Sequence, residues 1–159
     1  MLSVQGQFLL LPGPNTVRRA QETSIASEVS LAGHTSTKPK VLIVDDDPIL
    51  VKSMERVLQT FSKNKFDFVK VFDPLEAIKE FKKGNFSAVI TDLRMPGMNG
   101  VSMASKLKEI DGSVKIILVT GSPDDLEAQS VKHINAIVVK PFEGRYLLNI
   151  LELALSSHC

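Results

Sequence analysis

Residues 40–48 read KVLIVDDDP, in which a run of apolar residues ends in three aspartates and a proline. A short apolar run bounded by turn-forming residues predicts a buried strand, here over 41–44. A helix is expected to follow, with Asp47 as its N-cap and Pro48 in its first turn. The apolar residues of this helix share one face: Leu50, Met54, Val57, Leu58 and Phe61. The stretch therefore predicts a strand that passes directly into an amphipathic helix.

The same alternation of strand and helix continues as far as Leu155. Four more apolar runs predict strands over 66–71, 86–91, 114–119 and 136–139. Helices are predicted from Asp73, over about Gly100–Ile110, from Ser122, and over about Glu143–Leu155. Five apolar strands that alternate with five helices favour an α/β fold in which a parallel sheet is covered on both faces.

Length and composition limit the classes of function. The chain has 159 residues, of which 43% are apolar and 23% charged, so a single globular domain fits and disorder throughout is excluded. Its net charge of +1 offers no field for nucleic acid or an anionic membrane. The longest apolar runs have four residues, whereas a bilayer crossing needs about 20. The lone cysteine, Cys159, excludes an intrachain disulfide, and we expect a cytoplasmic protein.

Residues 1–39 differ from the rest because they are rich in Ser, Thr, Gly and Pro and lack clear periodicity. Their apolar patch, residues 8–11, runs into the turn-forming string at 12–15 and is too short for a secretory signal. An organellar transit segment is left open by the Arg and Ser content. We expect a flexible N-terminal tail over 1–39 and a folded domain over 40–159.

Chemically active side chains follow four of the five predicted strands. Asp45, Asp46 and Asp47 follow the first, Asp92 the third, Thr120 the fourth, and Lys140 with Pro141 the fifth. Because the carboxyl ends of parallel strands meet at one edge of the sheet, we expect these side chains to share a crevice. Converging carboxylates repel by about 4 kcal/mol per pair at roughly 4 Å in an effective dielectric near 20, and a divalent cation removes that cost. All-oxygen ligands favour Mg²⁺ or Mn²⁺ over zinc.

The lysine and the threonine suit an anionic ligand beside such a metal. Lys140 offers a positive charge and Thr120 a hydroxyl donor, a pair that fits a phosphoryl group. A carboxylate of the crevice could accept that group as an acyl phosphate. Each residue alone has a plainer interpretation. A strand-end aspartate often only caps the next helix, as we expect for Asp47, and a lone lysine or threonine is often solvated.

Four segments together resemble the receiver domain of two-component response regulators: VLIVDDDP at 41–48, TDLRMPGMNG at 91–100, LVTG at 118–121 and VKPF at 139–142. The resemblance covers Lys40 to about Ser157. It implies a flavodoxin-like, doubly wound sheet of five parallel strands in the order 2-1-3-4-5, with five helices. It also implies a signal-transduction protein that is not a turnover enzyme. In it, Asp92 would accept a phosphoryl group from a histidine kinase or a histidine phosphotransfer protein and lose it slowly by autodephosphorylation.

The resemblance assigns the metal ligands. Asp46 would bind Mg²⁺ directly, and Asp45 would act mainly through water. Asp92 and the backbone carbonyl of Arg94 would complete the site, in which Mn²⁺ could replace Mg²⁺.

The remaining strand-end residues take roles around the phosphoryl group. Thr120 would be the switch hydroxyl and Lys140 the amine that pairs with the phosphoryl oxygens, followed by a cis Pro141. Arg94 and Ser122 stand where the family tunes the lifetime of the acyl phosphate. A solvated Arg94 without such a role is an equally plain interpretation.

One position departs from the family pattern. Three residues before the lysine the family usually has Tyr or Phe, and this chain has Ile137. In the family this ring moves inward on activation. An aliphatic side chain is expected to stay packed, because exposing it would lose about 2 kcal/mol of burial. Activation should therefore change Gly121–Asp125 more than the surface of the last strand.

Nineteen residues follow Lys140, too few for a helix-turn-helix module. We therefore expect a stand-alone receiver domain, without a nucleic-acid-binding domain in this chain, that docks an unknown downstream protein or passes the phosphoryl group on. A homodimer is left open. Two alternatives remain: a receiver that is never phosphorylated and serves as a scaffold, and a phosphatase of the haloacid dehalogenase type. Against the phosphatase, Ile49 replaces the usual Thr or Val and Asp92 would have no role.

Overall fold

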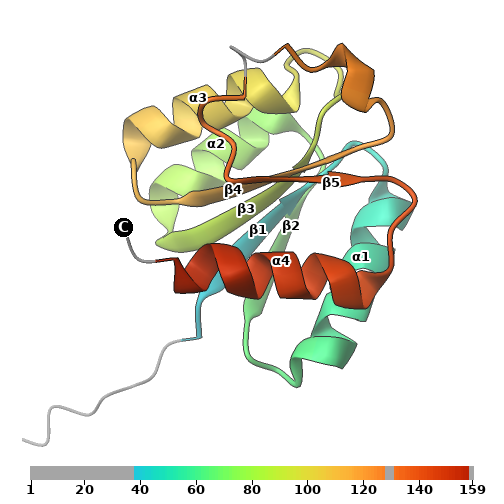
Figure 1. Cartoon of the computed structure of the whole chain (residues 1–159). Coiled ribbons are helices and arrows are strands. Elements are labelled where there is room, and N and C mark those ends of the chain that lie inside the picture. The colour runs from blue at the N-terminus through green and yellow to red at the C-terminus, as the bar shows by residue number, and fades with distance from the viewer. Residues whose placement is uncertain (1–37, 128–130, 158–159) are drawn as a thin grey trace, which may run out of the picture. The chain divides into compact units, whose positions relative to one another are not determined.

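The computed structural model describes residues 38–127 and 131–157. Its strands are β1 (Lys40–Val44), β2 (Asp67–Val71), β3 (Phe86–Asp92), β4 (Lys115–Thr120) and β5 (Ala136–Val139). They form one parallel sheet in the order β2-β1-β3-β4-β5 (Figure 1), which confirms the predicted fold class. The expected tail lies almost entirely outside the described residues, so its extent stays a prediction.

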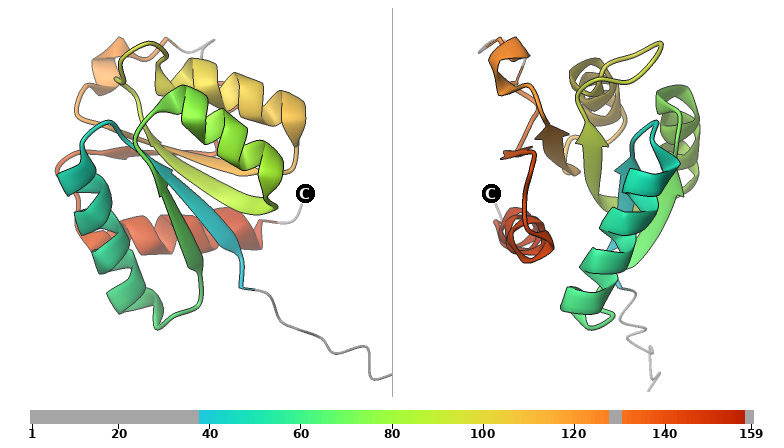
Figure 2. Two further views of the ribbon diagram at one scale, coloured as in Figure 1. Left: turned by 180° about the vertical axis from the view of Figure 1, so that it is seen from behind. Right: turned by 90° about the vertical axis from the view of Figure 1, so that its right-hand side faces the viewer.

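Four α-helices cover the sheet: α1 (Pro48–Ser62), α2 (Pro74–Lys83), α3 (Gly100–Ile110) and α4 (Gly144–Ser156). Helices α1 and α4 lie on one face, and α2 and α3 on the other (Figure 2). Because side chains alternate along a strand, β1 sends Val41 and Ile43 to the first core and Leu42 and Val44 to the second. In the described part of the chain, no helix is long and apolar enough to cross a membrane.

The predicted helix starts are present at α1 and α2. The Asp47 carboxylate accepts hydrogen bonds from the backbone N–H groups of Ile49, at 2.9 Å, and Leu50, at 3.3 Å. Asp73 accepts from the N–H of Glu76 at 2.8 Å. Each aspartate satisfies amide groups that the first helical turn leaves without partners. The caps therefore fix where the chain turns from the strand edge into the covering helix.

The predicted helix from Ser122 is wrong. Among the described residues between β4 and β5, 121–127 and 131–135, the only helix is the three-residue 3-10 helix η1 (Pro123–Asp125). None of the residues from Pro123 to Glu127 is buried, so a helix here would have no apolar face to pack against the sheet. The start signals of Ser122, Pro123 and the two acids therefore produce a turn and no more.

The expected packed position of Ile137 is also wrong. Ile137 is 38% exposed and Val139 47% exposed, whereas Val138 between them is fully buried in the α1/α4 core. The alternation of β5 points Ile137 and Val139 to the opposite face of the sheet. In the described residues between β4 and β5, no α-helix forms to cover these apolar side chains, which are accessible to solvent.

Candidate functional site

Three of the predicted site residues meet at the carboxyl edge of the sheet. Asp45 follows β1, Asp92 ends β3 and Lys140 follows β5. The Lys140 ammonium donates to Asp92 Oδ1 at 2.6 Å and to Asp45 Oδ2 at 3.5 Å. These residues lie 48 and 95 positions apart in sequence, so the parallel sheet is what brings them together. The positively charged ammonium of Lys140 thus lies between two carboxylates.

Burial and the neighbouring charges shift the pKa values of Asp45 and Lys140. Asp45 is only 4% exposed, and burial raises the pKa of its carboxyl, although the Asp47 N–H at 2.9 Å and the Lys140 charge partly oppose this. Burial acts to lower the pKa of Lys140, but its hydrogen bond to Asp92 and the charges of both aspartates outweigh it, so the pKa is raised. The ammonium is therefore held in its charged form by the acids it bridges.

The Asp92 carboxylate is fixed from a second side. The backbone N–H of Arg94 donates to Asp92 Oδ2 at 2.7 Å. The loop after β3 then turns back, and the Gly100 N–H donates to the Leu93 carbonyl at 2.9 Å. A Cβ on Gly100 would lie 2.1 Å from the Asp92 carbonyl oxygen, so this close approach requires glycine. Both oxygens of Asp92 are consequently oriented before any ligand arrives.

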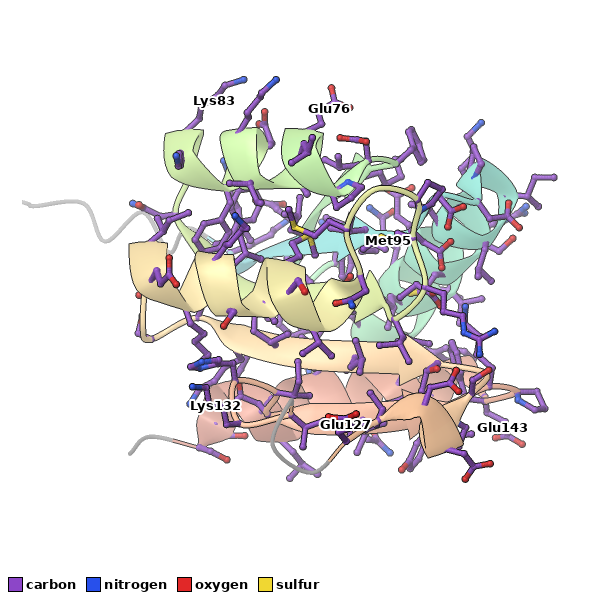
Figure 3. The ribbon with its side chains drawn as sticks, turned by 90° about the horizontal axis from the view of Figure 1, so that it is seen from above. Glu76, Lys83, Met95, Glu127, Lys132 and Glu143 are labelled. Atoms are coloured by element: carbon purple, nitrogen blue, oxygen red, sulfur yellow. The ribbon has the colours of Figure 1, made fainter. Side chains whose placement is uncertain are left out.

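The loop between β3 and α3 also contributes to the core. Met95, labelled in Figure 3, is 8% exposed and belongs to the buried cluster that also contains Phe81 and Met103. This methionine therefore anchors the loop beneath the site by packing.

Thr120 and Lys140 are linked through their backbones. Thr120 is 2% exposed, and its carbonyl accepts from the Lys140 N–H at 2.8 Å. The Thr120 hydroxyl oxygen accepts from the Ser122 N–H at 2.9 Å. The peptide bond between Lys140 and Pro141 is cis. The hydroxyl therefore holds the first residues of the β4–η1 connection.

Asp46 stands apart from this cluster. It is exposed and, in the described part of the chain, makes no hydrogen bond or ion pair. Of the two neighbouring acids, Asp45 accepts a hydrogen bond from Lys140 and Asp46 does not. Within 38–127 and 131–157, no three acidic, histidine or cysteine side chains are grouped closely enough to hold a metal.

Sequence reasoning missed one residue near the site. Asp125, on η1, forms an ion pair with the guanidinium of Arg94, 31 positions earlier. The two acids of η1 suggested only the start of a helix. No signal in the sequence pointed to this pair, because it depends on how the loops after β3 and β4 approach each other.

An apolar cavity of about 360 Å³ lies beside the lysine. It is lined by Met54 and Val57 of α1, by Leu147 of α4, and by Pro141 and Phe142 of the connection between β5 and α4. Ile49, at the start of α1, is 77% exposed. An accessible apolar surface therefore adjoins the polar site.

The family model of the response regulator receiver domain matches residues 41–152, from the first strand into the last helix. The chain belongs to this family. The receiver domain interpretation of the sequence is thus confirmed, and so is membership of two-component signal transduction.

Relatives of this receiver domain include two transcriptional regulatory proteins. PrrA of Mycobacterium tuberculosis is 32% identical over 108 residues, which are 67% of this chain and 45% of PrrA. FixJ of Bradyrhizobium diazoefficiens is 28% identical over 123 residues, which are 76% of this chain and 58% of FixJ. The chain therefore spans about half the length of these relatives.

Solved structures of receiver proteins match the fold. TrrA of Thermotoga maritima, in complex with Mg²⁺ and BeF, is 27% identical with a TM-score of 0.64, and the match covers 73% of this chain and 98% of TrrA. The chemotaxis response regulator CheY4 of Vibrio cholerae is 27% identical with a TM-score of 0.65, covering 74% and 99%.

Proposed function

We propose that this receiver domain accepts a phosphoryl group on Asp92 from a histidine kinase or a histidine phosphotransfer protein. The observation that carries the proposal is the Lys140 ammonium, 2.6 Å from an Asp92 oxygen and beside the buried Asp45. An amine fixed at the acceptor carboxylate neutralises charge where a phosphoryl group would arrive. The domain would signal by a conformational change or pass the phosphoryl group on.

The transfer is a displacement at phosphorus. One oxygen of Asp92 attacks the phosphorus atom of the donor phosphohistidine, the P–N bond breaks, and its electron pair returns to the imidazole nitrogen. The product is an acyl phosphate. Lys140 then pairs with a phosphoryl oxygen, and the Thr120 hydroxyl donates to another. Loss of the group follows when water attacks phosphorus and the Asp92 carboxylate departs, so the domain is an acceptor with slow autodephosphorylation and no turnover substrate.

Receiver domains typically bind Mg²⁺ at an acidic pocket, and the carboxylate and carbonyl oxygens at this edge of the sheet are the ligand type that such an ion prefers, although the described structure does not group three acidic side chains there. Asp46 is exposed and makes no hydrogen bond in the described residues, and Asp45 Oδ2 is engaged only by the 3.5 Å contact with Lys140. We assign direct binding to Asp46, Asp92 and the Arg94 carbonyl, and binding through water to Asp45; Mn²⁺ would fit the same oxygens. The ion would offset the negative charge that develops on the transferring group.

The donor protein has an accessible surface beside the site. Ile49 is 77% exposed, and the apolar cavity next to Lys140 lies between α1 and α4. A partner that inserts an apolar side chain there would bring its phosphohistidine close to Asp92. A cytoplasmic location and a homodimer stay predictions.

Incubation with a small-molecule phosphodonor and Mg²⁺, followed by intact mass measurement, tests the function. We expect the mass gain of one phosphoryl group in the natural chain. The gain should disappear in Asp92→Asn and in EDTA, and persist in Asp73→Asn, in which asparagine still caps α2. Full labelling of Asp92→Asn would refute the acceptor assignment, and a natural chain without labelling would favour the scaffold. Turnover of a generic phosphatase substrate would favour the phosphatase.

A further inference from the structure

Arg94 connects the acceptor residue to the loop after β4. Its backbone N–H donates to Asp92 Oδ2 at 2.7 Å, so its position is tied to the acceptor carboxylate. Its guanidinium pairs with the Asp125 carboxylate. The two side chains are 68% and 46% exposed, and an exposed ion pair of this kind contributes little to stability. The pair can therefore be exchanged for another partner at small cost.

The pair joins η1 to the loop after β3. In the described part of the chain, the other hydrogen bonds of Pro123–Asp125 stay within the same turn, from Asp125 N–H to the Ser122 carbonyl and from Leu126 N–H to the Pro123 carbonyl. No residue of η1 is buried. The ion pair with Arg94 is thus the polar contact that fastens η1 to the loop after β3.

A phosphoryl group on Asp92 would compete for the same guanidinium. It carries about −1.5 to −2 charge and three acceptor oxygens, whereas Asp125 carries a single negative charge. A guanidinium binds phosphoryl oxygens through two parallel N–H bonds, and Arg94 is already tethered next to Asp92. A phosphoryl group on Asp92 would therefore carry more negative charge than Asp125 and would be attached to the residue that Arg94 already contacts.

We propose that Arg94 exchanges Asp125 for the phosphoryl group, and that this exchange releases η1 as the output of the domain. Asp125 acts as a positioning residue that holds Arg94 away while Asp92 is unmodified. The device would serve in place of the aromatic ring of the family, since this chain has the aliphatic Ile137 at that position of the last strand. The inference rests on the proposed acceptor function of Asp92.

The lifetime of the acyl phosphate is the first readout, measured as decay of the phosphorylated mass after removal of the phosphodonor. Asp125→Asn removes the competitor, so Arg94 stays on the phosphoryl group and we expect a lifetime about two- to fivefold longer, the effect of one exposed ion pair. Arg94→Gln should shorten it. In the double variant Asp125→Asn should have no further effect, because the competition needs the arginine.

Asp124→Asn is the matched control, since Asp124 adjoins Asp125 on η1 and makes no hydrogen bond or ion pair in the described residues. Its lifetime should equal that of the natural chain. Amide exchange supplies a readout independent of hydrolysis: beryllofluoride should speed exchange over Pro123–Leu126 in the natural chain, whereas in Arg94→Gln exchange should be fast with or without it.

The outcomes separate the two proposals. Absence of any labelling of the natural chain would overturn the acceptor function itself. Labelling with equal lifetimes in Asp125→Asn and Asp124→Asn, and with η1 exchange unaffected by Arg94→Gln, would overturn the exchange of partners and leave the acceptor function standing.

Discussion

The ammonium of Lys140 bonds to the Asp92 carboxylate at 2.6 Å, although β3, which Asp92 ends, and β5, which Lys140 follows, are not neighbours in the sheet. This contact, with the longer one to Asp45, offsets the repulsion between two acids at one edge. Because Lys140 offsets the charges of both acids, its removal should make the free energy of unfolding depend on pH.

Lys140→Met should lower the free energy of unfolding near neutral pH by about 1–3 kcal/mol, the cost of leaving a buried charged group unpaired. Burial already raises the pKa of Asp45, and Lys140 opposes that rise, so the variant raises it further. The native state then holds a proton that the unfolded state has lost, so stability falls as pH rises and recovers in mild acid.

Urea unfolding at neutral and mildly acidic pH measures this recovery. Lys108→Met is the control, because Lys108 donates to the carbonyls of Gly112 and Val114 and its loss should cost the same at both pH values. A deficit of Lys140→Met that does not shrink in acid would contradict the coupling to Asp45.

The two neighbouring acids should differ as metal ligands. Asp45 already accepts from the Asp47 N–H and from Lys140, whereas Asp46 makes no hydrogen bond in the described residues. Asp45→Ala should weaken Mg²⁺ binding by about tenfold, as loss of a group acting through water does, and Asp46→Ala by more. Titration calorimetry with Mg²⁺ measures both, and Asp47→Asn, which keeps a capping side chain on α1, should bind normally. The reverse order would place Asp45 in direct contact with the ion.

The strands and most helices followed from the sequence because burial and capping act locally. The run before Asp45 is apolar since β1 is covered on both faces, and Asp47 and Asp73 cap as their positions indicate. The segment from Ser122 carries similar capping signals but has no apolar face. Because none of its residues is buried against the sheet, it forms only the short 3-10 helix η1. A start signal therefore predicts a helix only where the following residues can pack.

The candidate site followed from the sequence as far as topology determines it. Strand ends of a parallel sheet meet, so the proximity of Asp45, Asp92 and Lys140 was predictable. Which of Asp45 and Asp46 bonds to Lys140 depends on the backbone conformation of the turn after β1, which the motif alone does not express. The pairing of Arg94 with Asp125 depends on loop conformation and lies beyond any local pattern.

Removal of the residues before Thr37 should leave the domain folded. Both core clusters consist of residues from Val41 onward, so the truncated chain keeps every buried contact of the described structure. Its free energy of unfolding should change by less than about 0.5 kcal/mol, as surface changes usually do. Urea unfolding and phosphodonor labelling check this. Loss of cooperative unfolding would show that the segment before residue 37 is part of the folded unit.

Activation should change the amides after β4 more than those of β5. The Thr120 hydroxyl oxygen accepts from the Ser122 N–H at 2.9 Å, and turning the hydroxyl toward a phosphoryl group on Asp92 breaks this bond. Ile137 in β5 is 38% exposed and lacks the aromatic ring that moves inward in the family. Amide exchange with and without beryllofluoride and Mg²⁺ should therefore change over Gly121–Asp125, with smaller changes over Ile137–Val139.

Thr120→Val separates this route from a general loosening of the domain. Valine keeps the shape of the side chain but has no hydroxyl, so the Ser122 amide should exchange quickly in the variant and respond little to beryllofluoride. The competing view is that Ile137 changes rotamer on activation and reshapes the exposed surface of β5. Large exchange changes centred on Ile137–Val139, with Gly121–Asp125 unaffected, would support that view. An unaffected Ser122 amide would mean that activation leaves its hydrogen bond to the Thr120 hydroxyl in place.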